Sequence, residues 1–297
     1  MVIMLDAPDE RGIDGLREAV AALSEWQDDA APMQLHPGDI GWYWRTGAET
    51  TVAAVRTWRR NGRILAVGLL DGPRLLRLTT APDVRRDEEL ARQLAADATA
   101  PERGVLPAGE ANVEAPRDAV LLDVLSGAGW RADEPWTPLR RDLTAPVEDP
   151  GVWVETVGPE RVDVFTEVHR SAFGSPRFTS ERWHAMATGF PYEDARCLLA
   201  HDADGNAVAV ATVWSAGPGR PGLLEPVGVH AEHRGRGHGR TVTLAAAGAL
   251  RAMGASSALV ATPSANAPAV ATYRSAGFHP RPETRDLHRP PSPTPQG

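Results

Sequence analysis

Lysine is absent from this sequence: its 31 basic side chains, histidine aside, are all arginine. This absence excludes a lysine nucleophile or a Schiff base. The single cysteine, Cys197, cannot form an internal disulfide, so we expect a reduced, cytoplasmic protein. No apolar run reaches the roughly 18 residues that a membrane span needs, and the first residues, Met-Val-Ile-Met-Leu-Asp, are too few for the apolar region of a signal peptide. The sequence therefore predicts no association with a membrane.

Positive charge is also scarce relative to negative charge. The formal net charge is −8 and the pI is about 5.6, whereas a general nucleic-acid binder needs a net basic face. Nucleic acid is therefore not an expected partner, and any anion site must be local. At 297 residues with 42% hydrophobic residues, the chain is long enough for two cores.

A short segment without hydrophobic periodicity separates two patterned halves. Residues Leu143 to Gly151 contain two prolines and are typical of an interdomain linker. The last residues, from Arg289 to Gly297, are rich in proline and are expected to be disordered. We therefore predict an N-terminal domain of residues 1–144, a second domain of residues 145–288 and a tail of residues 289–297.

The C-terminal half has the pattern of an α+β domain around one mixed, mostly antiparallel sheet. A strand over Val152–Val157 and a helix over Glu160–Phe173 precede a polar and aromatic segment, Gly174–Asp194, to which the sequence assigns no element. The elements expected after it are strands at Cys197–Ala200, Ala207–Trp214, Leu223–Val229 and Ala258–Thr262, and helices at about Thr241–Met253 and Ala267–Ser275.

A glycine-rich turn lies between the expected strand Leu223–Val229 and the helix that follows it. Its residues from Val227 to Arg240 read Val-Gly-Val-His-Ala-Glu-His-Arg-Gly-Arg-Gly-His-Gly-Arg. Glycines at alternate positions let successive backbone amides line one concavity, and the start of a helix adds a partial positive charge. The turn could therefore hold a pyrophosphate, with charge-assisted contacts from Arg234, Arg236 and Arg240.

Two signatures together resemble the GNAT superfamily of acetyltransferases. The first is Gln/Arg-x-x-Gly-x-Gly/Ala after a Val-x-Val strand, which Arg234, Gly237 and Gly239 match. The second is an Asn, then a helix with a Tyr, then Gly-Phe, which Asn266, Tyr273 and Gly277-Phe278 match in the same order. The resemblance covers about residues 152–282.

The resemblance implies that acetyl-CoA is the cosubstrate. In the family, the pantetheine arm pairs with the strand before the turn, which splays from its neighbour. Pro226 fits this because it cannot donate to a ladder, and Gly228 is a candidate for the accompanying bulge. The expected coenzyme-binding residues are Val227, Gly228, Val229, Arg234, Gly235, Arg236, Gly237, His238, Gly239, Arg240, Asn266 and Tyr273.

Direct acetyl transfer requires a base, an oxyanion donor and an acid. Glu225 is the candidate base, because strict alternation would set it on the same face as Val227 and Val229, the wrong place for an unneeded carboxylate. A structural pair with an arginine is the alternative, and His230 is the reserve base. The backbone N–H near Val229 is the expected oxyanion donor. Tyr273, in the matching family position, would protonate the thiolate.

Other polar residues receive plainer interpretations. His230, His233 and His238 share no helical face on which to clamp zinc, so no metal is expected. Asn266 either anchors the coenzyme or caps the last helix, and both roles can hold together.

The N-terminal half resembles a degenerate copy of the C-terminal half. Residues 75–92 align with 224–240, and residues 117–130 align with 265–278. In this alignment Leu76 replaces Glu225 and Leu125 replaces Tyr273, while Glu88 and Leu90 replace the glycines of the turn. We therefore expect two GNAT-like lobes, the first without coenzyme and with a structural or substrate-gating role. Its aromatic run, residues 41–44, either faces the other lobe or is ordinary core.

The expected activity is acetyl transfer to a primary amine of a small molecule or peptide. One alternative is acetylation of a cysteinyl pseudodisaccharide, because the two-lobe layout is similar to that of mycothiol synthases. Another is an acyl-CoA-binding protein without turnover. Neither the acceptor nor the choice between monomer and homodimer follows from the sequence.

Overall fold

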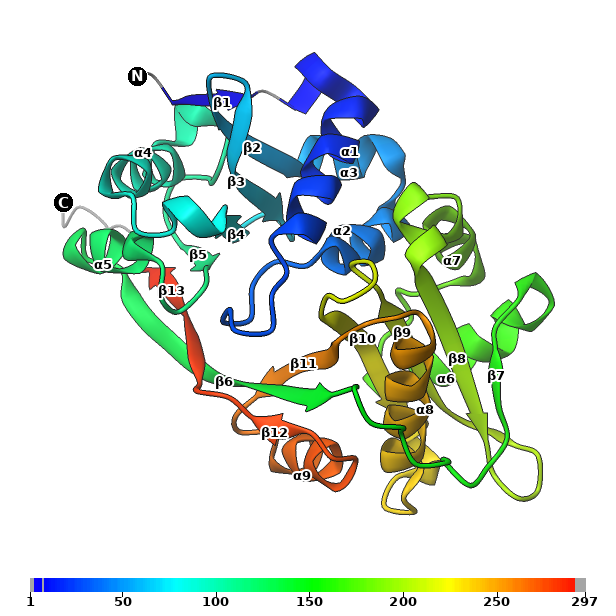
Figure 1. Cartoon of the computed structure of the whole chain (residues 1–297). Helices are drawn as coiled ribbons and strands as arrows, with labels where there is room; N and C mark the ends of the chain where they lie inside the picture. Colours follow the sequence, from blue (N-terminus) through cyan, green and yellow to red (C-terminus); the bar gives the residue numbers. More distant parts are fainter. Residues whose placement is uncertain (1–2, 7, 292–297) are drawn as a thin grey trace, which may run out of the picture.

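The computed structural model describes residues 3–6 and 8–291 and consists of two halves that lie side by side (Figure 1). The strands of the N-terminal half are β1 (Met4–Asp6), β2 (Val55–Arg60), β3 (Arg63–Leu70), β4 (Leu75–Thr80), β5 (Ala111–Glu114) and β6 (Arg131–Asp142). Its α-helices are α1 (Pro8–Glu25), α2 (Pro37–Tyr43), α3 (Ala48–Ala54), α4 (Glu88–Thr99) and α5 (Val120–Gly127), with 3-10 turns η1 (Trp44–Thr46), η2 (Pro82–Val84) and η3 (Pro101–Arg103).

The C-terminal half follows the order expected from the sequence. Its strands are β7 (Val154–Thr156), β8 (Ala195–His201), β9 (Ala207–Trp214), β10 (Gly222–Val229), β11 (Ser257–Pro263), β12 (His279–Pro280) and β13 (Thr284–Arg289). Its helices are α6 (Val162–Phe173), α7 (Ser180–Ala187), α8 (His238–Ala252) and α9 (Ala267–Ser275), with 3-10 turns η4 (Pro159–Arg161), η5 (Phe190–Asp194) and η6 (Ala231–His233).

The strands of both halves form one sheet in the order β1-β2-β3-β4-β5-β13-β6-β11-β10-β9-β8-β7, with β12 beside β6. Within the described residues, β4 pairs with β5 and β10 pairs with β11 in parallel, whereas the other strand pairs are antiparallel. The predicted α+β class with two mixed, mostly antiparallel lobes is confirmed. The internal repeat also holds in the topology, because the hairpin β3-β4, helix α4 and parallel strand β5 recur as β9-β10, α8 and β11.

Helices cover both faces of each half. In the N-terminal half, side chains of α4 and α5 pack into one core, and those of α1, α2 and α3 pack into another. In the C-terminal half, α8 and α9 share one core, whereas α6 and α7 share the other. Each helix contributes an apolar stripe to its core, as expected for amphipathic helices on a sheet.

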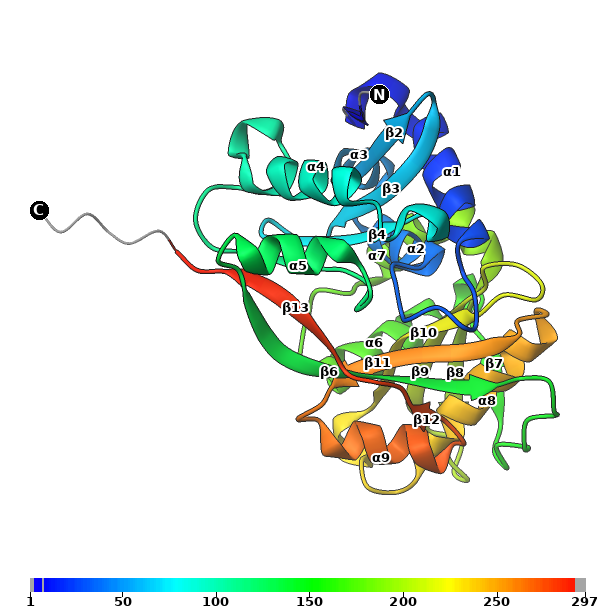
Figure 2. The ribbon, with the colours of Figure 1, turned by 60° about the vertical axis from the view of Figure 1, so that its left-hand side comes forward.

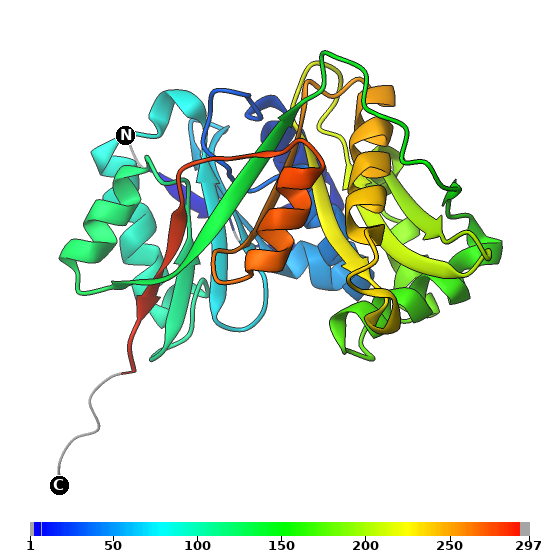
Figure 3. The same cartoon turned by 90° about the horizontal axis from the view of Figure 1, so that it is seen from below.

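The two halves exchange strands. The long strand β6 leaves the N-terminal half and pairs with β11 from Ser257 to Pro263 (Figure 3). In return β13, the last strand of the chain, lies between β5 and β6 (Figure 2). The predicted division at residue 144 thus falls just after β6, a strand that pairs with strands of the C-terminal half. Arg289 was predicted to start the tail, but it is the last residue of β13 and pairs with Ala111; residues 292–297 lie outside the described part.

The aromatic run at residues 41–44 faces the C-terminal half. A Cβ on Gly41 would lie 2.2 Å from Cζ3 of Trp214, so only glycine lets α2 approach this tryptophan so closely. The ring of Trp42 lies 4.8 Å from the ring of Phe178, between centroids. Both interpretations of this run hold in part, because Trp42 contacts the other lobe whereas Trp44 is buried in the core of the N-terminal half.

A helix lies in the segment to which the sequence assigned no element. Helix α7 begins after Thr179, whose side chain accepts a hydrogen bond from the Arg182 N–H. Its side chains Trp183 and Met186 are buried in the core of the C-terminal half. The missed signal was the N-cap threonine followed by Ser-Glu-Arg.

Candidate active site

Strands β10 and β11 open like a V at the centre of the C-terminal half. They pair only at two positions, Gly222 with Ala258 and Leu223 with Leu259. Beyond these two positions β10 continues to pair with β9 as far as Val229, whereas β11 continues to pair with β6. The opening is therefore lined by backbone of β10 that has lost its neighbour on one side.

A bulge interrupts β10 at the mouth of this opening. Leu224 pairs with Val213 and Val227 with Ala211, so Glu225 and Pro226 together face one residue of β9. The Glu225–Pro226 peptide bond is cis, and Nε1 of Trp214 donates a hydrogen bond to the Glu225 carbonyl at 2.8 Å. The prediction of a bulge at Gly228 was wrong, because proline, which lacks a donor, interrupts the ladder two residues earlier.

The bulge also overturns the argument from strict alternation. Leu224, Val227 and Val229 pair with β9 residues of one face and pack into the same core, so Leu224 rather than Glu225 shares the face of the two valines. The extra residue shifts the phase by one, which frees Glu225 from that core. Its side chain lines the pocket between the halves instead.

Backbone groups of Val227 and Val229 point into the opening. The His230 N–H donates to the Val208 carbonyl of β9 at 2.9 Å. Hydrogen bonds to one neighbour alternate along an antiparallel strand, so Gly228 also bonds towards β9 and the two valines face the other way. These are the groups expected to hold a pantetheine amide and an oxyanion.

The glycine turn follows β10 in the chain and leads into α8. Gly235 and Gly237 have φ of 74° and 88°, a left-handed conformation that favours glycine, and a Cβ on either would meet nothing within 4 Å. Gly237 is the N-cap of α8, and it has no side chain that could cap the helix. The first amides of α8 are thus not used by the N-cap residue, and an anion site there stays a prediction from the sequence.

The other two glycines of the motif are explained by packing. A Cβ on Gly228 would lie 2.7 Å from Cβ of Ala172, and one on Gly239 would lie 2.9 Å from Cγ2 of Thr272. Gly228 therefore lets α6 approach β10, and Gly239 lets α8 and α9 meet closely.

The three arginines of the turn have different surroundings. Arg234 donates to the Ala172 carbonyl at 2.6 Å, and Arg240 donates to the Ser275 carbonyl at 2.9 Å, so both hold the C-terminal ends of helices. Arg236 has no hydrogen bond or ion pair with another described residue. Its exposed guanidinium is the one most available to a ligand.

Histidines gather beside the turn. The His233 ring lies 5.4 Å from that of His230 and 6.2 Å from that of His238, between centroids. Burial and the charges of nearby groups lower the pKa of His238, so it is neutral at pH 7. In the part of the chain that the structure describes, no group of three His, Cys, Asp or Glu residues is placed to hold a metal ion.

Asn266 and Tyr273 come from α9. The Asn266 side chain accepts a hydrogen bond from the Ala269 N–H at 3.3 Å, which caps the helix, and it also lines the pocket. Tyr273 is only 8% exposed, and its hydroxyl has no hydrogen-bond partner among residues 3–6 and 8–291. Burial, with a smaller effect of Glu225, raises the pKa of Tyr273 to about 12, so the hydroxyl stays protonated.

A pocket of about 470 Å³ joins these residues between the two halves. Leu224, Glu225, Val227, Asn266 and Tyr273 line it from the C-terminal half. The residues from the N-terminal half and from β13 are Met33, Asp71, Leu75, Arg77, Glu114, Ala115, Trp136, Thr284 and Asp286. A volume of this size suits a small-molecule ligand.

The surroundings of Glu225 change the pKa of its carboxyl group. Burial and then the negative charge of Asp39 raise the pKa of Glu225 to about 8, against the opposing effect of Arg77. The arginine pairing considered as the alternative role therefore exists only in part: Arg77 attracts Glu225, but its ion pairs are with Asp39 at 2.8 Å and Glu114 at 2.7 Å.

Sequence reasoning missed the contribution of the N-terminal half. Arg77 lies in β4 within Leu-Leu-Arg-Leu-Thr-Thr, and this charged residue inside an apolar strand was the available signal. Asp39 gave none, because it reads as an ordinary residue of the first turn of α2, where it also accepts from the His36 N–H at 2.6 Å.

In the N-terminal half, the position that corresponds to the glycine turn is the N-terminus of α4, and a carboxylate of the same half occupies it. Asp87 caps α4 by accepting from the Leu90 N–H at 3.0 Å, and Arg60 pairs with Asp87 and Glu89, each at 3.1 Å. Glu88 lies in the same turn. A phosphate would have to displace a capping carboxylate, which supports the view that this lobe does not hold a coenzyme.

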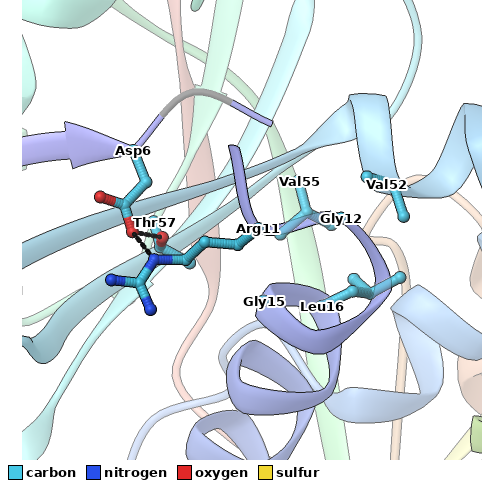
Figure 4. A pocket seen from close by; sticks show the side chains of 8 residues that line it. All are labelled: Asp6, Arg11, Gly12, Gly15, Leu16, Val52, Val55 and Thr57. Carbon is cyan, nitrogen blue, oxygen red and sulfur yellow. Dashed lines mark hydrogen bonds and ion pairs between the residues drawn. The ribbon is translucent and has the colours of Figure 1, made fainter. Parts of the chain in front are cut away.

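Two other cavities are smaller. One near α1 measures about 30 Å³ and is bounded by the ion pair of Arg11 with Asp6 at 3.3 Å (Figure 4). The other measures about 180 Å³ and adjoins the main pocket through Met33 and Thr284. Neither contains a candidate catalytic group.

The splayed parallel pair, the β-bulge and the glycine turn before a helix together form the arrangement that the resemblance to acetyltransferases implies. Residues 162–278 match the model of the acetyltransferase (GNAT) family. Residues 162–278 thus form a GNAT-type acetyltransferase domain, and this part of the chain is an acyltransferase domain. Such enzymes use acetyl-CoA and act on small-molecule or peptide acceptors. A comparison with curated proteins gave no match.

Solved structures are similar over the whole chain. A tandem GNAT protein from the clavulanic acid biosynthesis pathway has a TM-score of 0.61 and 18% identity, with 99% of each chain covered. A GCN5-related N-acetyltransferase from Sphaerobacter thermophilus has a TM-score of 0.59 and 21% identity, covering 98% of this chain and 97% of that one. A GNAT-family acetyltransferase from Colwellia psychrerythraea has a TM-score of 0.59 and 14% identity, covering 98% and 100%. These similarities establish the tandem fold.

Among the residues that the structure describes, none of the helices combines the length and the apolar character that crossing a bilayer requires.

Proposed function

We propose that this protein transfers the acetyl group of acetyl-CoA directly to a primary amine of a small molecule or peptide. The observation that carries the proposal is one continuous site. Val227 at the free edge of β10, Glu225 and Tyr273 line the pocket, and the glycine turn follows β10 in the chain just before α8. A groove for an extended arm and two titratable groups meet there, and the expected anion site is next to them in the chain.

The chemistry follows from these positions. The pyrophosphate is expected at the amides of Gly235 to Arg240, and the pantetheine arm along Val227 and Val229. Glu225 takes the proton of the attacking amine, directly or through water, as nitrogen bonds to the thioester carbon. The Val229 N–H stabilises the oxyanion, and the C–S bond then breaks as Tyr273 donates its proton to the thiolate.

The two alternatives are less well supported. A protein that binds acyl-CoA without turnover has no need of an unpaired tyrosine hydroxyl in the same pocket as a carboxyl of raised pKa. A cysteinyl pseudodisaccharide remains a candidate acceptor, although no residue of the pocket favours it over other amines. A cytoplasmic location, and a monomeric or homodimeric state, stay predictions from the sequence.

The test measures acetyl-CoA binding by calorimetry and thiol release with a panel of amines. Glu225→Gln and Tyr273→Phe should each lower kcat by about 10²-fold or more while the Kd for acetyl-CoA stays within about twofold. Glu167→Gln and Tyr192→Phe make the same chemical changes away from the pocket and should leave kcat unchanged. Unchanged turnover in both site variants would refute the roles, and absence of acetyl-CoA binding by the wild type would refute the function.

A further inference from the structure

The charge of the pocket is strongly one-sided. The lining residues that can carry charge are Asp71, Arg77, Glu114, Glu225 and Asp286, of which four are acids. They come from both halves of the chain and surround a space of about 470 Å³. Acetyl transfer itself needs one carboxylate as a base, so three further acids have no part in the reaction described above.

The single base does not balance these acids. Arg77 pairs with Glu114 at 2.7 Å, with Asp39 at 2.8 Å and with Asp71 at 3.7 Å, and its side chain is only 13% exposed. One positive charge is thus shared among three carboxylates. The wall of the pocket therefore keeps a net negative charge.

The acids form two groups on either side of Arg77. The negative charges of Asp39 and Asp71 raise the pKa of Glu225. Asp286 is in a separate group: burial and then the charge of Glu114 raise the pKa of Asp286 to about 7. Asp286 has no hydrogen bond or ion pair within the described chain. Both groups contain a carboxyl that a positive ligand would help to ionise.

Strand exchange creates the second group. Leu287 of β13 pairs with Val113 of β5, and the residues next to this pair, Asp286 and Glu114, both line the pocket. Two carboxylates close together on neighbouring strands repel each other. A repulsive pair at the wall of a pocket is what a site for a cation would contain.

Independent features mark this pocket as a built binding site. The Tyr273 side chain, which is 8% exposed, lines it, and its hydroxyl has no hydrogen-bond partner among the residues described. Trp136, which is 39% exposed, also lines it and offers an aromatic face to a cation.

We propose that the acceptor is an organic dication, a diamine in its simplest form. One amine is acetylated beside Glu225, and a second cationic group is held by Glu114 and Asp286 across the junction of the two lobes. The first amine loses its proton before it attacks the thioester, whereas the second keeps its charge throughout. This inference rests on the proposed function and names its class of acceptor.

The kinetic test compares 1,5-diaminopentane with 1-aminopentane at saturating acetyl-CoA. The wild type should use the diamine with a kcat/KM at least tenfold higher. Asp286→Asn and Glu114→Gln should each raise the KM for the diamine about tenfold, leave its kcat within twofold, and change the KM for the monoamine little. Glu110→Gln, a matched change just before β5, should alter neither. Equal kcat/KM for both amines would overturn the proposal and leave acetyl transfer intact.

A second readout does not depend on turnover. Without acetyl-CoA, 1,5-diaminopentane should raise the Tm of the wild type and of Glu110→Gln, but not that of the Asp286→Asn variant, whereas 1-aminopentane should raise none of them. The Tm and circular dichroism of the unliganded variants verify that they are folded. A diamine shift of the same size in Asp286→Asn would contradict the second site, whether or not the protein binds acetyl-CoA.

Discussion

The pKa of Glu225 is the result of opposing effects on one carboxyl group. Burial, Asp39 and Asp71 favour the neutral form, whereas Arg77 favours the carboxylate. The net result is a pKa of about 8, close to the pH at which a general base works best. Residues of the N-terminal lobe thus adjust the pKa of the proposed base in the other lobe.

This balance predicts the pH dependence. A base must be deprotonated to act, so kcat/KM should rise as the pH is raised through about 8. Asp71→Asn removes one negative charge, lowers the pKa of Glu225 and should move this rise to lower pH by roughly half a unit to one unit. Rates with one acceptor from pH 5.5 to 10 measure it.

The control is Asp123→Asn, which removes an exposed carboxylate from α5, outside the pocket. Its pH profile should coincide with that of the wild type. A profile of Asp71→Asn that also coincides, or that moves to higher pH, would show that Glu225 is not the group that titrates.

Among the elements, α2 determines how closely the two halves approach. Its glycines Gly38 and Gly41 lie against Trp214 of β9, and the indole of Trp214 holds the Glu225 carbonyl. The contact therefore links the packing between the lobes with the position of the bulge. A helix with larger side chains could not lie there.

A single methyl group tests this packing. The Cβ of Gly41→Ala would lie 2.2 Å from Cζ3 of Trp214, and such overpacking should lower the free energy of unfolding by about 1–3 kcal/mol. Displacement of Trp214 should also reduce turnover. Chemical denaturation and thiol release measure the two effects.

Gly248→Ala provides the matched comparison. Gly248 lies within α8, and a Cβ there would meet nothing within 4 Å. This variant should be as stable as the wild type or up to about 1 kcal/mol more stable, because alanine favours helix. Equal stability of the two alanine variants would contradict the packing argument.

On the scale of the whole molecule, the exchange of β6 and β13 joins the lobes into one sheet. Leu287 comes from the end of the chain, yet it is 5% exposed in the core formed with α4 and α5 of the N-terminal half. The lobes should therefore unfold together rather than as independent domains.

Leu287→Ala tests this coupling. It should lower the free energy of unfolding by about 2–5 kcal/mol, and hydrogen exchange should show the loss in peptides of both halves. Arg285→Ala, on an exposed position of the same strand, should change stability by less than about 0.5 kcal/mol. A loss confined to peptides of the N-terminal half would show that the lobes unfold separately.

Local patterns in the sequence predicted a large part of the fold. The expected helix Ala267–Ser275 and the strand Ala207–Trp214 agree with α9 and β9 to the residue, because caps and apolar runs are local signals. The glycine turn and its place before α8 also follow from neighbours in the chain. Helix α7 escaped notice because its apolar face is short.

Distant contacts decided the rest. The sequence alone predicted two related lobes, a glycine-rich turn in the second, and a carboxylate and a tyrosine as candidate catalytic groups. Only the tertiary structure placed the bulge at Pro226, brought Asp39 and Arg77 near Glu225 and brought Asp286 and Glu114 to the wall of one pocket. These contacts join residues separated by many positions along the chain, and strand pairing and packing, rather than local periodicity, bring them together.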